Sequence, residues 1–229
     1  MYHKYRADYS ADAIATLVSR TRLTREDDVA DLGAGTGILT RHLVERARHV
    51  YAIEPADDMR RAAEGGGATW IAGTAEATTL ADRSVDVVTC GNSFHYFDPD
   101  RARDEVARIL RPNGRVAILF HDVPLDPDDF MREYASFLQS HTPRQLASVH
   151  SAGDHKSRVA RFFENRNTII DNGEQNELLT WDHLRGRYLS SSLADENALD
   201  DLRTLFDRYE RDNVVTLQLT WTCISCDSF

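Results

Sequence analysis

Three glycines at alternating positions, directly after a short apolar run, have the spacing best suited to hold a nucleotide-like ligand. Residues 29–32 form the run and include Asp31, and the glycines are Gly33, Gly35 and Gly37. Glycine permits sharp turns and a close approach of the backbone to a ligand. The helix expected after the loop offers unpaired N–H groups to a carboxylate or phosphate. The spacing is G-x-G-x-G, whereas dinucleotide-binding proteins use G-x-G-x-x-G.

An acidic residue at the end of the next apolar run fits the same kind of ligand. Glu54 ends the run 49–54 and is followed by Pro55. In Rossmann-type sites an acid at the tip of the second strand accepts hydrogen bonds from ribose hydroxyls. Together with the glycines, Glu54 therefore predicts a site for an adenosine-bearing ligand.

Two histidines follow apolar runs that are expected to be buried strands. His95 and Tyr96 come after residues 85–90, and His121 comes after residues 116–120. Parallel sheets bind ligands at the carboxyl ends of their strands, and imidazole titrates near neutral pH. His95 or His121 could therefore serve as a general base. The alternative for each is a histidine that packs or forms hydrogen bonds beside the ligand.

The composition excludes several other classes of protein. A net charge of −10 over 229 residues argues against a nucleic-acid-binding protein, because such affinity depends on clustered Lys and Arg. The arginines between residues 101 and 115 are expected to form a solvated helix face. No apolar run is long enough for a membrane span and no signal-peptide core is visible, so cytoplasmic localisation is expected. Cys223 and Cys226 lack a second pair for a metal site and are expected to be structural.

The elements that must position these residues alternate between strand and helix. Ser10 is expected to cap a helix over residues 10–20. Crossover helices are expected over 38–48 and 59–64, and a further helix carries Val106, Ile109 and Leu110. Apolar runs predict five strands at 29–32, 49–54, 69–72, 85–90 and 116–120. This alternation predicts a parallel, right-handed α/β sheet.

The pattern changes after Asp122. Residues 123–180 are interpreted as helical and irregular, and residues 215–223 alternate between apolar and polar side chains. A period of two predicts an antiparallel strand at the sheet edge. The segment between them is then an insertion, interpreted as a lid. Its aromatic residues could wall a pocket, but aromatic side chains at helical spacing more often belong to a core. We expect residues 1–122 to form the cofactor-binding core, residues 123–190 a helical lid, and residues 191–229 a last helix and edge strands.

Further segments complete a set of motifs. They are Asp31–Gly37, Val50–Pro55 with Met59, Gly73–Glu76, Asp86–Thr89, Phe94–Asp98 and Leu110–Arg115. The set resembles that of class I S-adenosylmethionine-dependent methyltransferases, in the small-molecule group that includes quinone-biosynthesis and trans-aconitate methyltransferases. The likeness covers most of the chain outside roughly residues 123–177. It implies a doubly wound, mostly parallel seven-stranded sheet with an antiparallel last strand and a helical lid inserted after the fifth strand.

The resemblance also implies roles for particular residues. Asp31 and the glycine loop would hold the methionine part of the cofactor, and Glu54 would bind the ribose. Met59 would flank the adenine ring, and Thr74 stands where the family often has Asp. The residues expected to bind the cofactor are Arg6, Asp31, Gly33, Ala34, Gly35, Gly37, Glu54, Pro55, Met59, Thr74, Ala75, Glu76 and Asn92. Arg6 would do so as part of a Y-x-x-x-R segment beginning at Tyr2.

The function implied is methyl transfer from S-adenosylmethionine to a small-molecule acceptor, with S-adenosylhomocysteine as product. An aromatic or unsaturated metabolite is the expected acceptor, with natural-product biosynthesis as one setting, and no metal, nucleic acid or membrane is expected to take part. The transfer is an in-line displacement that needs alignment, with His95 and Tyr96 as candidate catalytic residues. Two alternatives stay open: an NAD-dependent oxidoreductase, and an S-adenosylmethionine-binding protein without transferase activity. The sequence leaves the oligomeric state open.

Overall fold

The computed structural model describes residues 5–63, 66–124, 126–141, 152–164, 166–190 and 194–229. The chain divides into two compact units. Unit 1 comprises Met1–Ala7, Asp122–Ser151 and Glu174–Thr220. Unit 2 comprises Asp8–His121, Ala152–Gly173 and Trp221–Phe229. Of the expected insertion, residues 152–173 thus lie in unit 2 together with the cofactor-binding core.

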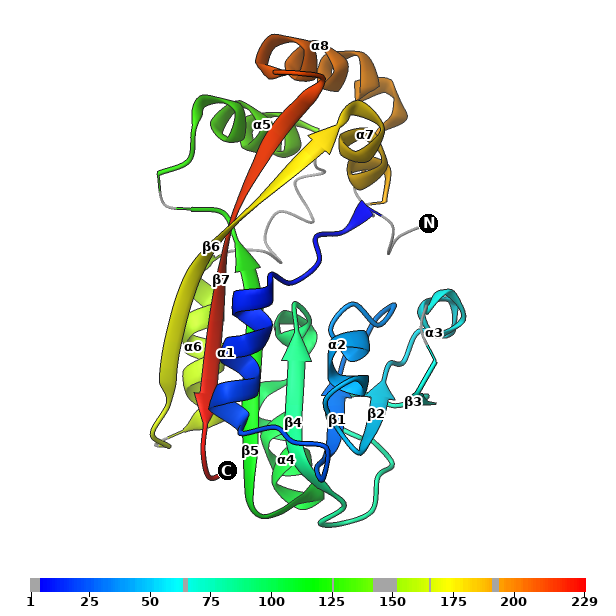
Figure 1. The fold of residues 1–229 in the computed structure, drawn as a ribbon, viewed down its shortest axis with the longest axis vertical. Coiled ribbons are helices and arrows are strands. Elements are labelled where there is room, and N and C mark those ends of the chain that lie inside the picture. Colours follow the sequence, from blue (N-terminus) through cyan, green and yellow to red (C-terminus); the bar gives the residue numbers. More distant parts are fainter. Residues whose placement is uncertain (1–4, 64–65, 125, 142–151, 165, 191–193) are drawn as a thin grey trace. The chain divides into compact units, whose positions relative to one another are not determined.

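A seven-stranded sheet in the order β3-β2-β1-β4-β5-β7-β6 organises the fold. Neighbours from β3 to β5 pair in parallel, whereas β7 runs opposite to its neighbours (Figure 1). The strands are β1 (Asp28–Leu32), β2 (His49–Ile53), β3 (Ala68–Ile71), β4 (Val85–Gly91), β5 (Leu110–Asp122), β6 (Ile169–Thr180) and β7 (Val214–Cys226). The predicted mostly parallel α/β sheet with an antiparallel last strand is therefore confirmed.

Helices cover both faces of the sheet in unit 2, with α1 in front of the strands and α6 behind them in the view of Figure 1. The first cluster of buried residues joins Ala30 and Val88 to Val106 and Phe163. The opposite cluster includes Val29, next to Ala30 in β1, because successive side chains of a strand point to opposite faces. The helices of unit 2 are α1 (Ala11–Thr21), α2 (Thr40–Val44), α3 (Asp57–Ala62), α4 (Pro99–Ile109) and α6 (Ala152–Phe163).

Most of the predicted elements are found, with differences in extent. Ser10 caps α1 by accepting a hydrogen bond from the amide of Ala13 at 3.2 Å. The expected crossover helix over residues 38–48 shortens to α2, whereas α3 begins at Asp57, ahead of its expected start. The expected end of α3 at Glu64 lies outside the described residues.

Strand β5 starts earlier than predicted. Val85 pairs with Leu110, but Val87 pairs with Arg115, so residues 111–114 bulge out of the ladder. Asn113 has a φ of 65°, which fits the turn expected from the Arg-Pro-Asn-Gly sequence. The turn therefore exists, but it is inserted within β5.

Two expectations for the second half of the chain are wrong. Residues 169–180, expected to be helical or irregular, form β6, and β6 forms the sheet edge in place of β7. Of the residues of β6, only Leu179 is buried, so this strand lacks the apolar alternation that reveals a strand in sequence. Gly173 allows β6 to approach β7 closely, because a Cβ there would lie 2.4 Å from the ring of Trp221.

Unit 1 has its own hydrophobic cluster. Its helices are α5 (Asp129–Ser140), α7 (Trp181–Leu189) and α8 (Leu199–Tyr209). Phe130 and Phe137 of α5 belong to one buried cluster with Leu184, Leu202 and Leu217. The aromatic side chains of α5, for which a core role was favoured over a pocket wall, are thus part of the core of unit 1.

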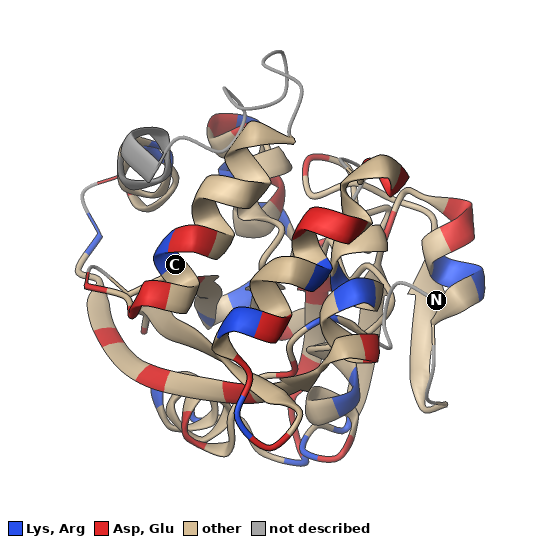
Figure 2. Ribbon diagram, turned by 90° about the horizontal axis from the view of Figure 1, so that it is seen from above, with Lys and Arg blue, Asp and Glu red and all other residues tan. Residues whose placement is uncertain are grey.

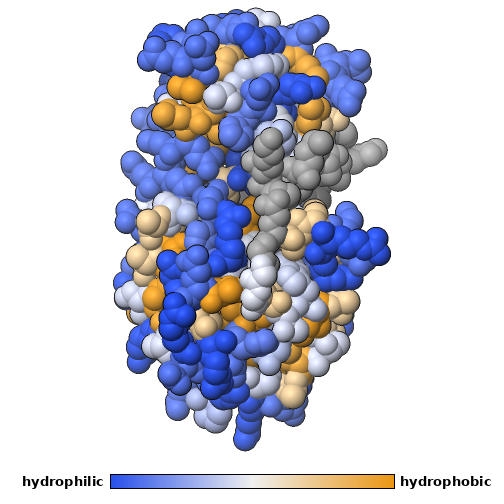
Figure 3. All heavy atoms as spheres, turned by 45° about the vertical axis from the view of Figure 1, so that its right-hand side comes forward, coloured by the Kyte–Doolittle hydropathy of each residue, from blue (hydrophilic) through white to orange (hydrophobic). Residues whose placement is uncertain are grey.

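The three cysteines are buried and free. Cys223 and Cys226 belong to different hydrophobic clusters, as their spacing in a strand predicts. Among the described residues, no group of acidic, His or Cys side chains is arranged to hold a metal ion. No described helix is long and apolar enough to cross a membrane. On the face drawn in Figure 3, hydrophobic residues occur in small groups between hydrophilic ones.

Candidate functional site

The glycine loop after β1 adopts a backbone conformation that L side chains rarely adopt. Gly33, Gly35 and Gly37 have φ values of 63°, 58° and 88°. A Cβ at Gly33 would lie 2.6 Å from the side chain of Ser93, so this glycine is needed for packing. A Cβ at Gly35 would meet nothing within 4 Å. Gly35 is therefore an open position in the loop.

Glu54 joins the loop to the end of β2. Its side chain is 8% exposed, and Oε2 accepts a hydrogen bond from the amide of Gly35 at 2.9 Å. The other oxygen, Oε1, accepts one from the amide of Ala56, also at 2.9 Å. An ionised carboxylate has about four acceptor sites, so two remain for hydroxyl donors. The structure thus brings together Glu54 and the glycine loop, the two features from which an adenosine-bearing ligand was predicted.

Asp31 lies in the interior beneath the loop and is 1% exposed. Its carboxylate accepts hydrogen bonds from Thr40 Oγ1 at 2.7 Å and from Thr89 Oγ1 at 2.9 Å. Burial raises the pKa of Asp31 to about 6, although the two hydroxyls partly offset this effect. The carboxylate therefore ties β1 to α2 and β4. Neither threonine was identified from the sequence, because a hydroxyl partner far along the chain leaves no local signal.

Thr36 is a further residue that the sequence analysis did not assign to the site. It stands between Gly35 and Gly37 and is 4% exposed. Its Oγ1 is buried and has no hydrogen-bond partner among the described residues. Buried hydroxyls are normally satisfied. A ligand with a polar group at the open side of the loop would supply the missing partner, so the residues present fit such a ligand.

The loop after β3 carries three residues that the resemblance assigns to the cofactor, and they lie in different surroundings. Thr74 is exposed, and its backbone pairs with that of Ala77 through two hydrogen bonds of 3.2 Å. Ala75 is 2% exposed and belongs to the core. Glu76 accepts a hydrogen bond from the amide of Asp98 at 2.8 Å, just before α4.

The residues after β2 form a turn next to Glu54. Pro55 is exposed, and Met59 in α3 is half-buried. Arg60 donates hydrogen bonds to the carbonyls of Glu54 at 2.6 Å and of Pro55 at 2.8 Å. These bonds hold the turn that follows Glu54. Ala34 donates to the carbonyl of Ile53 at 3.0 Å and so fixes the loop to β2 from the other direction.

A polar cluster forms where β4 and β5 end. Asn92 Oδ1 accepts a hydrogen bond from the backbone amide of His121 at 2.7 Å, and Asn92 Nδ2 lies 3.3 Å from Nδ1 of the same residue. The rings of Tyr9 and His121 lie 4.6 Å apart. The structure thus pairs Asn92, expected to bind cofactor, with the second candidate base.

His95 and Tyr96 lie on a short 3₁₀ helix, η2 (Phe94–Tyr96), after β4. Their ring centroids are 4.0 Å apart. Phe94 is buried in the core, whereas Tyr96 is 70% exposed. The two candidate catalytic residues therefore follow the strand that was expected to present them.

The N-terminal segment is fastened to α2. Asp8 accepts a hydrogen bond from His42 Nε2 at 2.8 Å and pairs with Arg41 at 2.8 Å. Burial alone would raise the pKa of Asp8, but His42 and Arg41 outweigh it and lower the pKa to about 2. Arg6 belongs to unit 1 and Asp8 to unit 2. Tyr2, the first residue of the expected Y-x-x-x-R segment, lies outside the described residues.

Comparisons with known proteins agree with this geometry. Residues 30–118 match the sequence family described as "Methyltransferase domain", a segment that includes the glycine loop, Glu54 and Asn92. An uncharacterised methyltransferase of Mycobacterium tuberculosis is 40% identical over 122 residues, or 52% of this chain and 49% of the relative. One of Schizosaccharomyces pombe is 30% identical over 123 residues, with the same coverage. The chain thus spans about half the length of the curated relatives it matches.

Solved structures show the same fold at low identity. A protein of Anaeromyxobacter dehalogenans proposed to be a type II methyltransferase superposes with a TM-score of 0.69 at 20% identity, covering 97% of this chain and 98% of that one. Geranyl diphosphate C-methyltransferase of Streptomyces coelicolor, solved with S-adenosyl-L-homocysteine, gives 0.54 at 14% identity, covering 96% and 77%. Residues 30–118 of the chain therefore match a methyltransferase domain, in agreement with the motifs that predict one.

Proposed function

We propose that this protein transfers a methyl group from S-adenosylmethionine to a small-molecule acceptor, an aromatic or unsaturated metabolite. The observation that carries the proposal is the contact between the Glu54 carboxylate and the amide of Gly35 at 2.9 Å. This contact places an acid with spare acceptor capacity beside an open glycine, as a ribose with two hydroxyls requires. The S-adenosylhomocysteine bound to the Streptomyces coelicolor neighbour supports the choice of cofactor.

Different residues at and around the loop would bind different parts of the cofactor. Glu54 would accept hydrogen bonds from the ribose hydroxyls, and such charge-assisted bonds are stronger than neutral ones. Thr36 Oγ1 and the backbone around Gly35 would bind the polar end of the cofactor. Asp31 would act from below, because its contacts with Thr40 and Thr89 hold the loop and α2 in place. The half-buried Met59 would cover the adenine.

Alignment is the main contribution that the protein must make to the reaction. When bound, S-adenosylmethionine supplies a methyl group already activated on a sulfonium sulfur, and the transfer is an in-line displacement. The protein orients the acceptor against that methyl group and excludes water. His95, Tyr96 and His121 stand at the carboxyl ends of β4 and β5, where an acceptor would approach.

The charge distribution favours a small-molecule acceptor over a nucleic acid. The arginines near α4 are largely neutralised: Arg103 pairs with Asp100 at 3.3 Å, Arg108 with Glu105 at 2.8 Å and Arg111 with Asp86 at 2.6 Å. Acidic and basic residues are interspersed over the ribbon in Figure 2. A phosphate backbone is bound by clustered cations that are free to contact it.

Calorimetric titration of the purified protein with S-adenosylhomocysteine tests the cofactor assignment. The wild type should bind, and Glu54→Ala should bind about 10- to 100-fold more weakly, since lost hydrogen bonds to a charged group cost about 1–3 kcal/mol. Glu45→Ala is the matched control, because Glu45 is exposed and forms a surface ion pair with Arg46 at 3.2 Å. Equal affinity of both variants would contradict the role of Glu54. Binding of NADH in place of S-adenosylhomocysteine would support the oxidoreductase alternative.

Transfer itself needs a second measurement. The protein is incubated with S-adenosylmethionine carrying a labelled methyl group and a small-metabolite extract, and labelled products are identified by mass spectrometry. A labelled small molecule that depends on Glu54 supports the proposal. Cofactor binding without any labelled product would favour the alternative of a binding protein without transferase activity.

A further inference from the structure

The loop between β3 and β4 contains a residue in a strained backbone conformation. Thr79 has a φ of 64°, which lies in the left-handed region. A β-branched residue adopts such a φ very rarely, because its Cβ crowds the following carbonyl oxygen. Thr79 is exposed, so the packing of its own side chain does not impose this conformation. The conformation is therefore held through the residues on either side, Thr78 and Leu80.

Both neighbours of Thr79 are bound by side chains of α4. Glu105 Oε1 accepts hydrogen bonds from the backbone amide of Thr78 at 2.7 Å and from its hydroxyl at 2.6 Å. Arg108 donates to the carbonyl of Leu80 at 2.8 Å. Glu105 and Arg108 lie one helical turn apart and pair with each other at 2.8 Å. Two residues of one helix thus hold the chain on both sides of the strained position.

Glu105 is the more buried of the two helix residues. Its side chain is 10% exposed, whereas that of Arg108 is 36% exposed. The Arg108 guanidinium lowers the pKa of Glu105 to about 2; burial opposes this effect, and the bonds from Thr78 add to it. The carboxylate is therefore ionised at neutral pH, and it forms stronger hydrogen bonds than a neutral acceptor would. Because Thr78 is fully buried, removal of this carboxylate would take the acceptor away from two buried donors.

The loop that Glu105 holds begins beside Glu54. The amide of Glu54 donates to the carbonyl of Ile71, the last residue of β3, at 3.1 Å. A Cβ at Gly73 would lie 3.2 Å from the side chain of Ile53, so the chain leaves β3 in close contact with the end of β2. A base attached to a ribose at Glu54 is therefore within reach of the loop after β3.

We propose that Glu105 is a positioning residue that acts through Thr78 and holds the loop after β3 in the shape that receives the base of the cofactor. A loop that is already in place does not have to be ordered on binding, so the affinity for the base is higher. The proposal rests on the proposed function, because that function supplies the nucleoside. It concerns the base alone, since the ribose and the methionine part are assigned to Glu54 and the glycine loop.

Calorimetric titration with two ligands tests whether the effect is confined to the base. S-Adenosylhomocysteine carries the base, and S-ribosylhomocysteine is the same molecule without it. Glu105→Ala should bind S-adenosylhomocysteine about tenfold or more weakly than the wild type, and S-ribosylhomocysteine within about threefold of it. Unchanged affinity for S-adenosylhomocysteine, or equal losses for the two ligands, would overturn the proposal. Absence of S-adenosylhomocysteine binding by the wild type would overturn the proposed function as well.

Asp86→Ala is the matched control. Like Glu105, Asp86 accepts hydrogen bonds from a backbone amide, that of Asp28 at 2.8 Å, and from an arginine, Arg111 at 2.6 Å. Both alanine variants should unfold at lower urea concentration, but Asp86→Ala should bind S-adenosylhomocysteine within about threefold of the wild type. Glu105→Gln keeps an oxygen for Thr78, so its affinity should also stay within about threefold. An equal loss of affinity in all three variants would show that binding follows stability alone, against the proposal.

Relief of the strain at Thr79 gives an independent readout. Asparagine tolerates the left-handed region better than threonine does, and position 79 is exposed. In Glu105→Ala, the added substitution Thr79→Asn should therefore return the affinity for S-adenosylhomocysteine to within about threefold of the wild type. A double variant as weak as Glu105→Ala would refute the proposal, even where S-ribosylhomocysteine binds too weakly to measure. If Glu105→Ala does not fold, Thr78→Val replaces it: one of the two bonds to Glu105 is removed, and a loss of affinity below about threefold would count against the proposal.

Discussion

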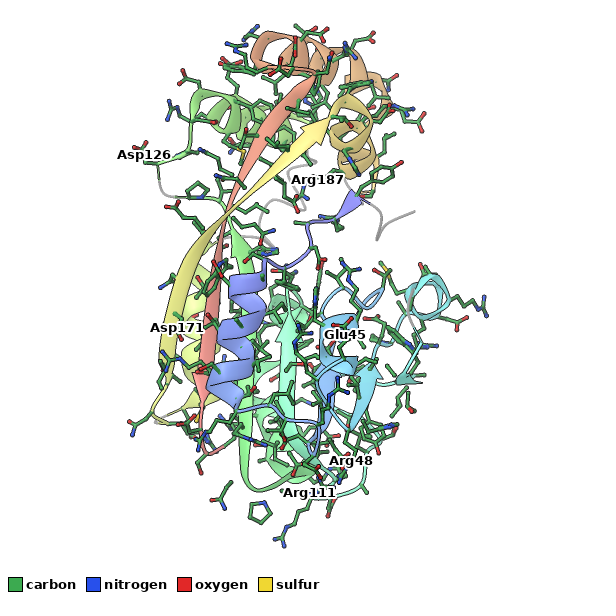
Figure 4. All side chains as sticks on the ribbon, viewed as in Figure 1. Glu45, Arg48, Arg111, Asp126, Asp171 and Arg187 are labelled. Atoms are coloured by element: carbon green, nitrogen blue, oxygen red, sulfur yellow. The ribbon has the colours of Figure 1, made fainter. Side chains whose placement is uncertain are left out.

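The acidic residues at the two ends of the sheet in unit 2 have different kinds of partner. At the amino ends of the strands, Asp28 pairs with Arg48 at 2.8 Å and with Arg111 at 3.0 Å. At the carboxyl ends, Asp31 and Glu54 are bound by hydroxyls and backbone amides. Figure 4 shows Arg48 and Arg111 close together at the former end. One end is thus neutralised by cations, while the other keeps its acids among neutral donors.

The difference has an electrostatic consequence. Arg48, followed by burial and Arg111, sets the pKa of Asp28, and the net effect is to lower it. Burial raises the pKa of Asp31 to about 6, and the hydroxyls of Thr40 and Thr89 offset this effect only in part. A carboxylate already paired with arginine has little acceptor capacity left for a ligand. The carboxyl end therefore retains the capacity to bind hydroxyl or cationic groups, and the amino end contributes to stability.

Alanine substitutions at Gly33 and Gly35 should show which of the two loop glycines is needed for packing and which for ligand binding. Gly33→Ala combines a left-handed φ with a Cβ 2.6 Å from Ser93, so it should lower the free energy of unfolding by about 2–5 kcal/mol. Gly35→Ala meets open space and should cost only about 1–2 kcal/mol, from backbone strain. Urea denaturation measures both values.

For cofactor binding, Gly35→Ala is the variant expected to have the marked effect. The Cβ of Gly35→Ala occupies the open side of the loop, so its affinity for S-adenosylhomocysteine should fall by about tenfold or more. Stable folding with unchanged affinity would contradict the placement of the ligand at Gly35. A loss of stability in Gly35→Ala as large as in Gly33→Ala would contradict the division of the loop into packing and ligand positions.

The pH dependence of stability should distinguish Asp31 from Asp28. The folded state binds the proton of Asp31 more tightly than the unfolded state, so this group's stabilisation is present below pH 4 and is lost as the pH rises to about 6. The loss is about 2–3 kcal/mol, and Asp31→Asn should abolish it. Asp28 has a lowered pKa, so its contribution is present above pH 4 and lost as the pH falls further. Urea denaturation from pH 3 to pH 7 measures both, with Asp28→Asn as the comparison; identical profiles for the two variants would contradict the difference between the ends.

The parts of the fold with strong local patterns could be predicted from the sequence. The buried β4 has an apolar run, and Ser10 has the right type and position for a helix cap. The glycine loop and Glu54 could be predicted because their chemistry is encoded by residue type and order. Strand β6 could not, since an edge strand with one buried residue carries no apolar period.

The polar contacts of the site were less predictable for a physical reason. Asp31 is bound by Thr89, and Asn92 by His121, and the residues of each pair are far apart in the chain. Which hydroxyl or carboxamide meets which acid depends on strand order and register, and these emerge only in the folded sheet. The residues of the site could thus be predicted from the sequence, whereas their hydrogen-bond partners could not.

The smallest expected effect concerns the amino end of the sheet. Arg111→Met keeps much of the apolar stem but removes the contacts to Asp28 at 3.0 Å and Asp86 at 2.6 Å. Because the Arg111 side chain is 35% exposed, solvent screens these contacts, and unfolding should become easier by only about 1 kcal/mol. Affinity for S-adenosylhomocysteine should not change, since no ligand is proposed at this end. Calorimetry and urea denaturation of one preparation measure both quantities, and a change in affinity of more than about threefold would show that the two ends are coupled. Arg48 continues to pair with Asp28 in this variant, so the fold itself should persist while the comparison is made.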